Sequence, residues 1–369
     1  MIIGVPKEVK VHEYRVAIVP AGVKQLVDAG HEVRIEANAG EGSRITDAQF
    51  EAAGAKIVPT TEALWSGSEM IMKVKEPVAI EHERIQAGQT LFTYFHLAAV
   101  PELAPVLIEK KVSAIAYETV ELDDGRLPML HPMSVVAGKM ATQVGATLLE
   151  RGRGGKGVLL GGVPGVRRGR VVVLGGGTSG TAAAKIAVGL GASVTVIDIS
   201  LPRLEYLDDI FGSRVNLVAS NPLSIADEVR RADLVVGAVL VPGRRAPTLV
   251  TGELVREMDP GSVVVDIAVD QGGCIETIRP TTHDEPTYVV DDVLHYGVTN
   301  MPGAVAHTST YALTNATLRY AMRIADLGPL GAAKSDPALA KGFNTHGGQV
   351  THQAVAEDLG LPFSPLDAN

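Results

Sequence analysis

The sequence predicts an α/β protein with two mostly parallel sheets. Short apolar runs alternate with amphipathic runs along most of the chain, an order typical of a parallel sheet with helices on both faces. The 369 residues exceed one ordinary hydrophobic core and suit two domains. A glycine-rich turn near the middle of the chain opens a second series of strands and helices.

The composition excludes several classes of protein. Hydrophobic residues make up 46% and charged residues 20%, as in a globular chain. The net charge of −9 argues against a nucleic-acid-binding surface, and a single cysteine, Cys274, excludes a disulfide framework or a cysteine-rich metal site. No other metal ligand set stands out. Charge near the N-terminus and the absence of a membrane-spanning apolar run predict a soluble, cytoplasmic protein without a membrane partner.

The first part of the chain predicts a series of strands separated by helices. The expected strands are residues 2–5, 31–37, 56–58, 69–74, 90–95 and 112–117. Helices are expected at 20–29, ended by Gly30, and at 46–54, where Thr46 is the cap and Gly54 the stop. A further helix-like segment spans 100–111.

The second series predicts a domain inserted into the first. A helix at 134–149 and an irregular crossing or hairpin at 151–170 lead to a strand at 171–174. Further strands are expected at 193–199, 215–220, 232–239, 262–269 and 287–293, and one long helix at 304–328. The last residues are too few for a domain of this class, so we expect them to pack back onto the first domain. The predicted domains are therefore 1–128 with 307–369, and 129–306.

The glycine-rich turn has the spacing of a dinucleotide-binding turn. Gly175 permits the tight turn, Gly177 lets the backbone approach a pyrophosphate, and Gly180 lets the helix pack on the strand. The helix N-terminus offers N–H groups to phosphates. A glycine turn without a ligand is the alternative, but the strand, the helix and the next strand together favour a Rossmann domain.

An acid at the end of the next strand bears on the cofactor. Asp198 lies about 20 residues after the glycines, where it would accept a hydrogen bond from the ribose 2′-OH and repel a 2′-phosphate. Arg203 lies nearby and could serve NADP, but Asp198 is the better-placed group, so NAD is predicted.

Ligands bind at the carboxyl ends of parallel strands, and this rule gives the remaining cofactor candidates. Each alone could be ordinary loop or core, but as a set they predict a crevice. They are Ser220, Val239, Leu240, Ile267, Ala268, Val269, Asp270, Val298, Thr299, Asn300 and Met301, with Ser134 and Thr178 added.

Three polar residues in the first domain have either a role in the reaction or a purely structural role. The run LFTYFHLAA, residues 91–99, places His96 after an apolar strand, and alone it favours a packed core histidine. Arg15 alone is most simply a solvated surface charge, and Lys75, after EMIMKV, would normally extend its ammonium into solvent.

Motifs along nearly the whole chain resemble the alanine dehydrogenase family. They are GVPKE (4–8), EYRVAIVP (13–20), KVKEP (73–77), TYFHLA (93–98), HPMSVVAGKMATQVGA (131–146), LGGGTSG (174–180), DIAVDQGG (266–273) and NMPGAVAHTSTYALTNAT (300–317). The nucleotide-binding segment of proton-translocating transhydrogenase is the nearest relative and shares GVPKE and RVA. The histidine of TYFHLA and the uninterrupted HPMSVVAGKM belong to the alanine dehydrogenase pattern.

The resemblance implies reversible, NAD-dependent oxidative deamination of L-alanine to pyruvate and ammonium. It implies a substrate domain formed by the two ends of the chain, an inserted NAD domain with hydride transfer across the cleft, and a homohexamer built as a trimer of dimers. Arg15 and Lys75 correspond to substrate-binding positions, His96 to the general acid/base, and Asp270 to a catalytic partner facing it. A transhydrogenase subunit and a non-catalytic dinucleotide sensor are the alternatives; Arg15, Lys75 and His96 argue against the sensor.

Overall fold

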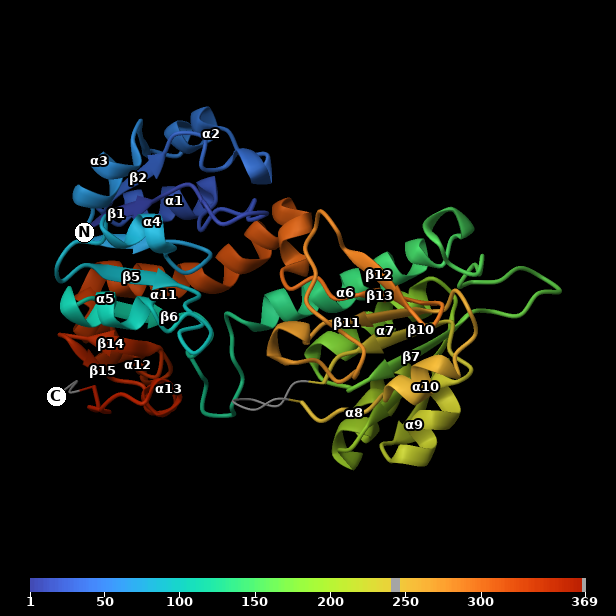
Figure 1. Ribbon diagram of the computed structural model, residues 1–369. Coiled ribbons are helices and arrows are strands. Elements are labelled where there is room, and N and C mark those ends of the chain that lie inside the picture. The colour runs from blue at the N-terminus through green and yellow to red at the C-terminus, as the bar shows by residue number, and fades with distance from the viewer. Residues whose placement is uncertain (240–245, 367–369) are drawn as a thin grey trace. The chain divides into compact units, whose positions relative to one another are not determined.

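The computed structural model describes residues 1–239 and 246–366, and the predicted α/β class is confirmed (Figure 1). The chain forms two compact units. The first unit is Met1–Met133 with Gly303–Asn369, and the second unit is Ser134–Pro302. Among the described residues, none of the helices combines the length and the apolar character needed to cross a membrane.

The first unit contains a mixed sheet of eight strands in the order β15-β14-β6-β5-β4-β1-β2-β3. The strands from β1 to β6 are parallel, whereas β14 and β15 are antiparallel additions at one edge. The C-terminal segment therefore joins the sheet of the first unit through the β14–β6 pair. The strands are β1 (Ile2–Val5), β2 (Glu32–Glu36), β3 (Lys56–Val58), β4 (Met70–Met72), β5 (Thr90–Thr93), β6 (Ser113–Ala116), β14 (Phe343–His346) and β15 (Gln349–Val350).

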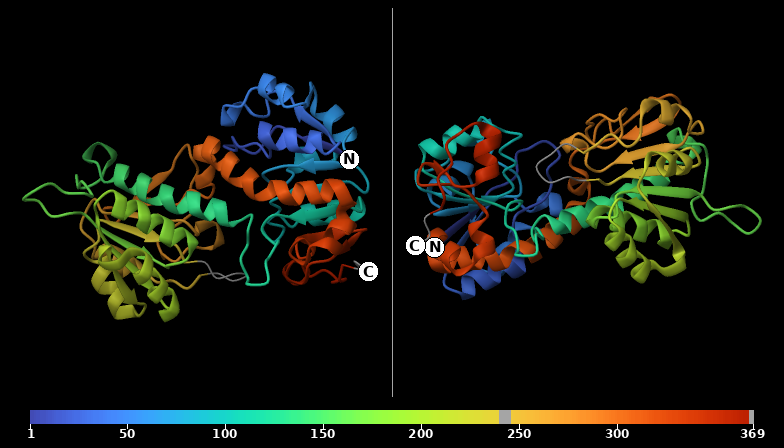
Figure 2. Two further views of the ribbon diagram at one scale, coloured as in Figure 1. Left: turned by 180° about the vertical axis from the view of Figure 1, so that it is seen from behind. Right: turned by 90° about the horizontal axis from the view of Figure 1, so that it is seen from below.

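The helices predicted at 20–29 and 46–54 lie within two residues of their predicted bounds, whereas the helix predicted at 100–111 spans only Leu103–Glu109. The side chain of Thr46 accepts the N–H of Gln49 at the start of α2, as expected of a cap. The helix predicted at 304–328 is interrupted at its predicted end, because Gly328 has non-helical backbone with φ 70°, and a second helical stretch follows from Pro329 within the same element. Figure 2 shows this helix, α11, as the long orange element. The helices are α1 (Pro20–Asp28), α2 (Asp47–Ala52), α3 (Thr61–Ser66), α4 (Ala79–His82), α5 (Leu103–Glu109), α11 (Ala306–Ser335), α12 (Pro337–Ala340) and α13 (Gln353–Leu359), with the short η1 (Glu41–Ser43).

The second unit contains a seven-stranded sheet in the order β12-β13-β11-β10-β7-β8-β9. All of its pairs are parallel except β12–β13. The strand order reverses between β7 and β10, where dinucleotide-binding sheets place their ligand. The strands are β7 (Arg170–Leu174), β8 (Ser193–Asp198), β9 (Val215–Ala219), β10 (Leu234–Gly237), β11 (Val263–Asp266), β12 (Thr287–Val290) and β13 (Val293–Tyr296).

The prediction of a single strand at 287–293 is wrong. The segment turns back on itself, so that β12 pairs with β13 in an antiparallel hairpin. The two turn residues, Asp291 and Asp292, have φ of 48° and 61°. A two-residue hairpin turn of type I′ has positive φ at both positions, and aspartate tolerates positive φ better than most residues.

The helices of the second unit begin with α6, which starts at His131, three residues before the predicted start. The segment 151–170 contains η2 and an isolated antiparallel bridge between Val163 and Val166. The helices are α6 (His131–Leu148), α7 (Thr178–Gly189), α8 (Leu201–Phe211), α9 (Pro222–Val229) and α10 (Gly252–Arg256), with η2 (Arg151–Arg153), η3 (Gly212–Arg214), η4 (Val269–Gln271) and η5 (Met301–Val305).

Candidate active site and nucleotide-binding site

The glycine-rich turn joins β7 to α7, and each of its three glycines meets a different demand. Gly175 has φ 93°, a conformation that strongly favours glycine. A Cβ on Gly180 would lie 1.8 Å from the Gly175 carbonyl oxygen, so a side chain there would force α7 away from the strand. A Cβ on Gly177 would meet no atom within 4 Å.

The open space at Gly177 fits a bound pyrophosphate. Gly177 is the cap residue of α7 and is exposed, and Thr178 is the first residue of the helix. Packing within the protein does not require glycine there, whereas a phosphate lying against this backbone would. The cradle and the unpaired N–H groups of the first helical turn therefore suit an anionic dinucleotide.

Asp198 and Arg203 both contact the glycine turn. Asp198 ends β8, and its carboxylate accepts the N–H of Gly176 at 2.6 Å and that of Ser200 at 2.8 Å. Arg203 donates from Nε to the Gly176 carbonyl at 2.6 Å and from Nη2 to Thr181 Oγ1 at 2.7 Å. The carboxylate thus stands at the strand end where a ribose is expected, while the guanidinium is bonded to the turn.

The other cofactor candidates follow the ends of β9, β10, β11 and β13 on the same side of the parallel sheet. Ser220, which follows β9, donates its N–H to the Asp198 carbonyl at 3.0 Å. Val239 follows β10, and Leu240 lies outside the described residues. Ile267, Ala268, Val269 and Asp270 follow β11, and Val298, Thr299, Asn300 and Met301 follow β13.

Ser134 lies on α6, next to the N-terminal turn of α7. A Cβ on Gly138, one helical turn after Ser134, would lie 2.0 Å from the Ser179 carbonyl oxygen. The two helices are therefore in close backbone contact at this point, which places Ser134 near the glycine turn.

Arg15 is buried in the first unit, so its interpretation as a solvated surface charge is wrong. Its side chain is 2% exposed and forms a two-pronged ion pair with Glu13, with Nε 2.6 Å from Oε1 and Nη2 2.5 Å from Oε2. Burial alone would raise the pKa of Glu13, but Arg15 more than offsets this and holds it below the ordinary value. A third donor, Nη1, contacts the weak acceptor Met133 Sδ at 3.1 Å.

Lys75 lies three residues beyond the end of β4, in partly buried surroundings. Burial, followed by repulsion from the Arg15 guanidinium, lowers the pKa of the Lys75 ammonium. The two cations therefore repel each other, and a carboxylate bound to both would relieve that repulsion. Thr93, the last residue of β5, donates its hydroxyl to the Lys75 carbonyl at 3.0 Å.

His96 lies three residues beyond the end of β5, and it is not a packed core residue. Its side chain is 37% exposed, and its ring stacks on Tyr94 with centroids 5.7 Å apart. Its backbone has φ 47°, which is uncommon for a residue other than glycine. The carboxylate of Glu118 accepts the N–H of His96 at 2.6 Å and that of Phe95 at 3.1 Å.

The first unit thus brings Arg15, Lys75 and His96 to one edge of its sheet. Lys75 and His96 occupy equivalent places after the neighbouring parallel strands β4 and β5, and the His96 ring stacks on Tyr94. Asp270, predicted as their catalytic partner, belongs to the second unit and lies in η4.

Two acidic residues that the sequence did not predict as site residues, Glu13 and Glu118, hold Arg15 and His96. Glu13 carried a detectable signal, because an acid two residues from an arginine can reach its guanidinium. Glu118 follows β6, the strand next to β5, so its contact with His96 requires knowledge of the strand order.

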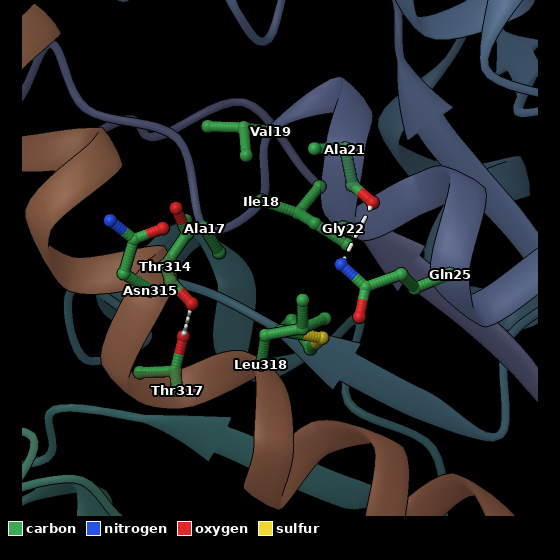
Figure 3. Close-up of a pocket in the computed structure, with 11 residues that line it drawn as sticks. Ala17, Ile18, Val19, Ala21, Gly22, Gln25, Thr314, Asn315, Thr317 and Leu318 are labelled. Atoms are coloured by element: carbon green, nitrogen blue, oxygen red, sulfur yellow. Dashed lines mark hydrogen bonds between the residues drawn. The ribbon is translucent and has the colours of Figure 1, made fainter.

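A small cavity lies behind the segment that follows Arg15 (Figure 3). It is lined by Ile18, which precedes α1, by Gln25 within α1, and by Asn315 and Leu318 of α11. Its volume of about 50 Å³ accommodates a few water molecules. A cavity of this size and mostly apolar lining does not suit an amino-acid substrate.

Comparisons with known proteins agree with this arrangement. Residues 4–137 match the family described as "Alanine dehydrogenase/PNT, N-terminal domain", and residues 141–353 match "Alanine dehydrogenase/PNT, C-terminal domain". An alanine dehydrogenase of Methanococcus maripaludis is 57% identical over 368 residues, covering 100% of this chain and 99% of the relative. The chain belongs to the alanine dehydrogenase family.

Solved structures separate the two branches of this family. A structure of L-alanine dehydrogenase has 54% sequence identity and a TM-score of 0.95, covering 98% of this chain and 99% of its own. A transhydrogenase from Sinorhizobium meliloti has 27% identity and a TM-score of 0.82, covering 96% of this chain and 100% of its own. The alanine dehydrogenase branch is therefore favoured over the transhydrogenase alternative, and family and fold together imply a nicotinamide cofactor.

Proposed function

We propose that this chain is an NAD-dependent alanine dehydrogenase, which converts L-alanine, NAD⁺ and water reversibly to pyruvate, ammonium, NADH and a proton. The observation that carries the proposal is the convergence of two cations and a histidine, Arg15, Lys75 and His96, on one sheet edge of a chain in this family. When bound, the nicotinamide accepts hydride from the substrate Cα. The remaining steps need groups that hold the substrate and move protons.

Arg15 and Lys75 are proposed to bind the substrate. The Arg15 guanidinium is oriented by Glu13, and its Nη1 contacts a sulfur that a carboxylate oxygen would replace as a stronger acceptor. The Lys75 ammonium would donate to the same carboxylate or to the ketone oxygen. Either contact offsets the repulsion between the two cations.

His96 is proposed to act as the general acid/base. Oxidation of alanine gives an iminium, water adds to it, and the resulting carbinolamine loses ammonia. Water gives up a proton in the addition, and the amine takes one up before it leaves. Histidine changes charge between about pH 5 and 8, so it can serve both steps. The half-exposed ring of His96 is accessible for this task.

NAD is proposed over NADP. The Asp198 carboxylate stands at the end of β8, where a 2′-phosphate would meet its negative charge. Arg203, the cation that could bind such a phosphate, is already bonded to Gly176 and Thr181. Asp270 is proposed to share proton transfer or orient water, and the family resemblance supports a homohexamer arranged as a trimer of dimers.

A spectrophotometric assay tests the proposed function. The purified chain should form NADH from NAD with L-alanine and consume NADH with pyruvate plus ammonium, without any partner protein. Sedimentation of the same preparation should give the mass of six chains. Failure to turn over either substrate pair, with NADH still bound, would contradict the proposal and favour a transhydrogenase subunit.

A further inference from the structure

A fully buried cluster of charges lies beneath the segment that carries Lys75. Lys73 Nζ lies 3.1 Å from Glu8 Oε2 and 2.9 Å from Glu81 Oε1. The side chains of all three residues are at most 3% exposed. Glu8 belongs to the motif GVPKE and Lys73 to KVKEP, and neither has a place in the proposed chemistry.

Stability alone does not account for this cluster. Removing water from charged groups costs several kcal/mol for each ion, and apolar residues of similar volume often stabilise a core as well as a buried ion pair does. The cluster therefore calls for a second role. Buried charges are best justified where they fix one local conformation.

The conformation that Glu8 fixes is that of the main chain at Lys75. Glu8 Oε1 accepts the N–H of Val74 at 2.6 Å and that of Lys75 at 3.4 Å. Lys73 engages the other oxygen of the same carboxylate, and Glu81 holds Lys73 from the far side. Glu8 is thus bonded directly to the backbone just beyond β4, and Glu81 is linked to Glu8 through Lys73.

A second contact holds Lys75 from the opposite side. The Thr93 hydroxyl donates to the Lys75 carbonyl at 3.0 Å, and the Tyr94 N–H donates to the Val74 carbonyl at 3.3 Å. Glu8 and Lys75 each lie three residues beyond the ends of neighbouring strands, β1 and β4, and Thr93 ends the next strand, β5. Glu8, which follows β1, and Thr93, which ends β5, therefore hydrogen-bond to the N–H and the C=O of Lys75.

We propose that Glu8 and Thr93 are positioning residues that hold the Lys75 ammonium in place for the substrate, and that Lys73 and Glu81 hold Glu8. This inference rests on the proposed role of Lys75 in substrate binding. A lysine side chain has many rotamers, so the position of its ammonium depends on a fixed main chain. The main chain of Lys75 is fixed because both its N–H and its C=O are hydrogen-bonded.

The experiment compares kcat/KM for L-alanine in the Thr93→Val and Glu8→Gln variants of the full chain. Thr93→Val removes one hydrogen bond with little change of shape or charge, so it should fold. A displacement of about 1 Å in a substrate-binding group can cost about 100-fold, so we expect losses of roughly 10- to 100-fold in kcat/KM. NADH affinity should not change. The double variant should lose less than the product of the two single losses, because both act on Lys75.

A matched control comes from the second unit. Asp233 accepts the N–H of Arg170 at 2.6 Å and pairs with Lys156 at 2.6 Å, the same combination of backbone and lysine contacts that Glu8 makes. Asp233 directly precedes β10, and its partner Arg170 begins β7, so this contact lies at the opposite end of β7 from the glycine turn. Asp233→Asn should lower the melting temperature and leave kcat/KM for alanine unchanged.

A Lys75→Met variant separates the possible failures. If Lys75→Met keeps wild-type kcat/KM, the proposed role of Lys75 is wrong, and the inference is wrong with it. If Lys75→Met is impaired while Thr93→Val and Glu8→Gln only lower the melting temperature, as Asp233→Asn does, the inference alone is overturned. Should Glu8→Gln fail to fold, Thr93→Val decides by itself. Raised KM with retained NADH affinity in Thr93→Val supports the inference.

Discussion

The carboxylate of Glu118 accepts the backbone N–H of His96 at 2.6 Å and holds this residue at φ 47°. The two residues follow neighbouring strands, β6 and β5, so the sheet itself brings them together. Left-handed backbone at a residue other than glycine costs roughly 1–3 kcal/mol and persists when the surroundings enforce it. Glu118 and the stacked ring of Tyr94 provide that enforcement.

This relationship predicts the effect of two substitutions at Glu118. Glu118→Ala removes the acceptor, so the backbone at His96 should relax and kcat should fall by roughly 10- to 100-fold, as for other losses of a supporting group. Glu118→Gln keeps an acceptor oxygen and should lose less. Initial rates of alanine oxidation on folded protein give both values. Equal losses in the two variants would show that the charge, and not the backbone contact, is what matters.

Pyruvate binding should weaken at alkaline pH. Burial and Arg15 lower the pKa of Lys75, so the ammonium becomes neutral at a lower pH than an ordinary lysine with a pKa of about 10.4. Contact with the carboxylate is therefore present at neutral pH and is lost as pH rises through the lowered pKa. The Kd of pyruvate, measured with NADH bound, should rise in this range.

The Lys75→Arg variant is the control for that pH dependence. Arginine keeps its charge throughout the alkaline range, so the rise in Kd should disappear even if binding is weaker overall. The same alkaline rise in both proteins would assign it to another group.

Cofactor preference should depend on the charge of Asp198. The wild type should use NAD much better than NADP, and Asp198→Ala should narrow the ratio of their kcat/KM values. Because the carboxylate also accepts the Gly176 N–H, Asp198→Asn, which keeps an acceptor oxygen, separates charge from turn structure. Equal use of both cofactors by the wild type would contradict the NAD assignment.

The substrate should have a small side chain. Arg15 is buried, and Lys75 and His96 are partly buried, so a larger side chain would have to displace packed groups. Each poorly accommodated methylene costs about 1–3 kcal/mol in transition-state binding. A panel of L-amino acids should show turnover of alanine and little turnover of leucine or phenylalanine. Comparable rates with a bulky amino acid would count against alanine as the substrate.

The sequence was most informative where chemistry and local structure coincide. The glycine turn could be predicted because each glycine meets a local requirement of backbone or packing, and Gly175 and Gly180 confirm it in the structure. The α/β class could be predicted because each strand and helix has its own local pattern of apolar residues. Burial of Arg15 could not be predicted, because the ion pair that allows it belongs to the tertiary structure.

Features that depend on strand order or on competing local preferences were missed. Residues 288–290 and Val293 are apolar, but the two aspartates between them accept positive φ and turn the segment into a hairpin. The hydrogen bonds of Glu8 and Thr93 with the main chain of Lys75 join residues far apart in the chain. They can be recognised only once β1, β4 and β5 are known to lie side by side.

The most direct test of the account is the turnover of His96→Gln, measured together with NADH affinity on one folded preparation. Glutamine keeps a polar side chain of similar reach but cannot act as an acid or base near neutral pH. Loss of a positioned acid/base typically costs about 10² to 10⁴ in rate, so we expect alanine oxidation to fall by that factor while NADH affinity stays unchanged. Turnover close to that of the wild type would contradict the assignment of this sheet edge as the site of proton transfer.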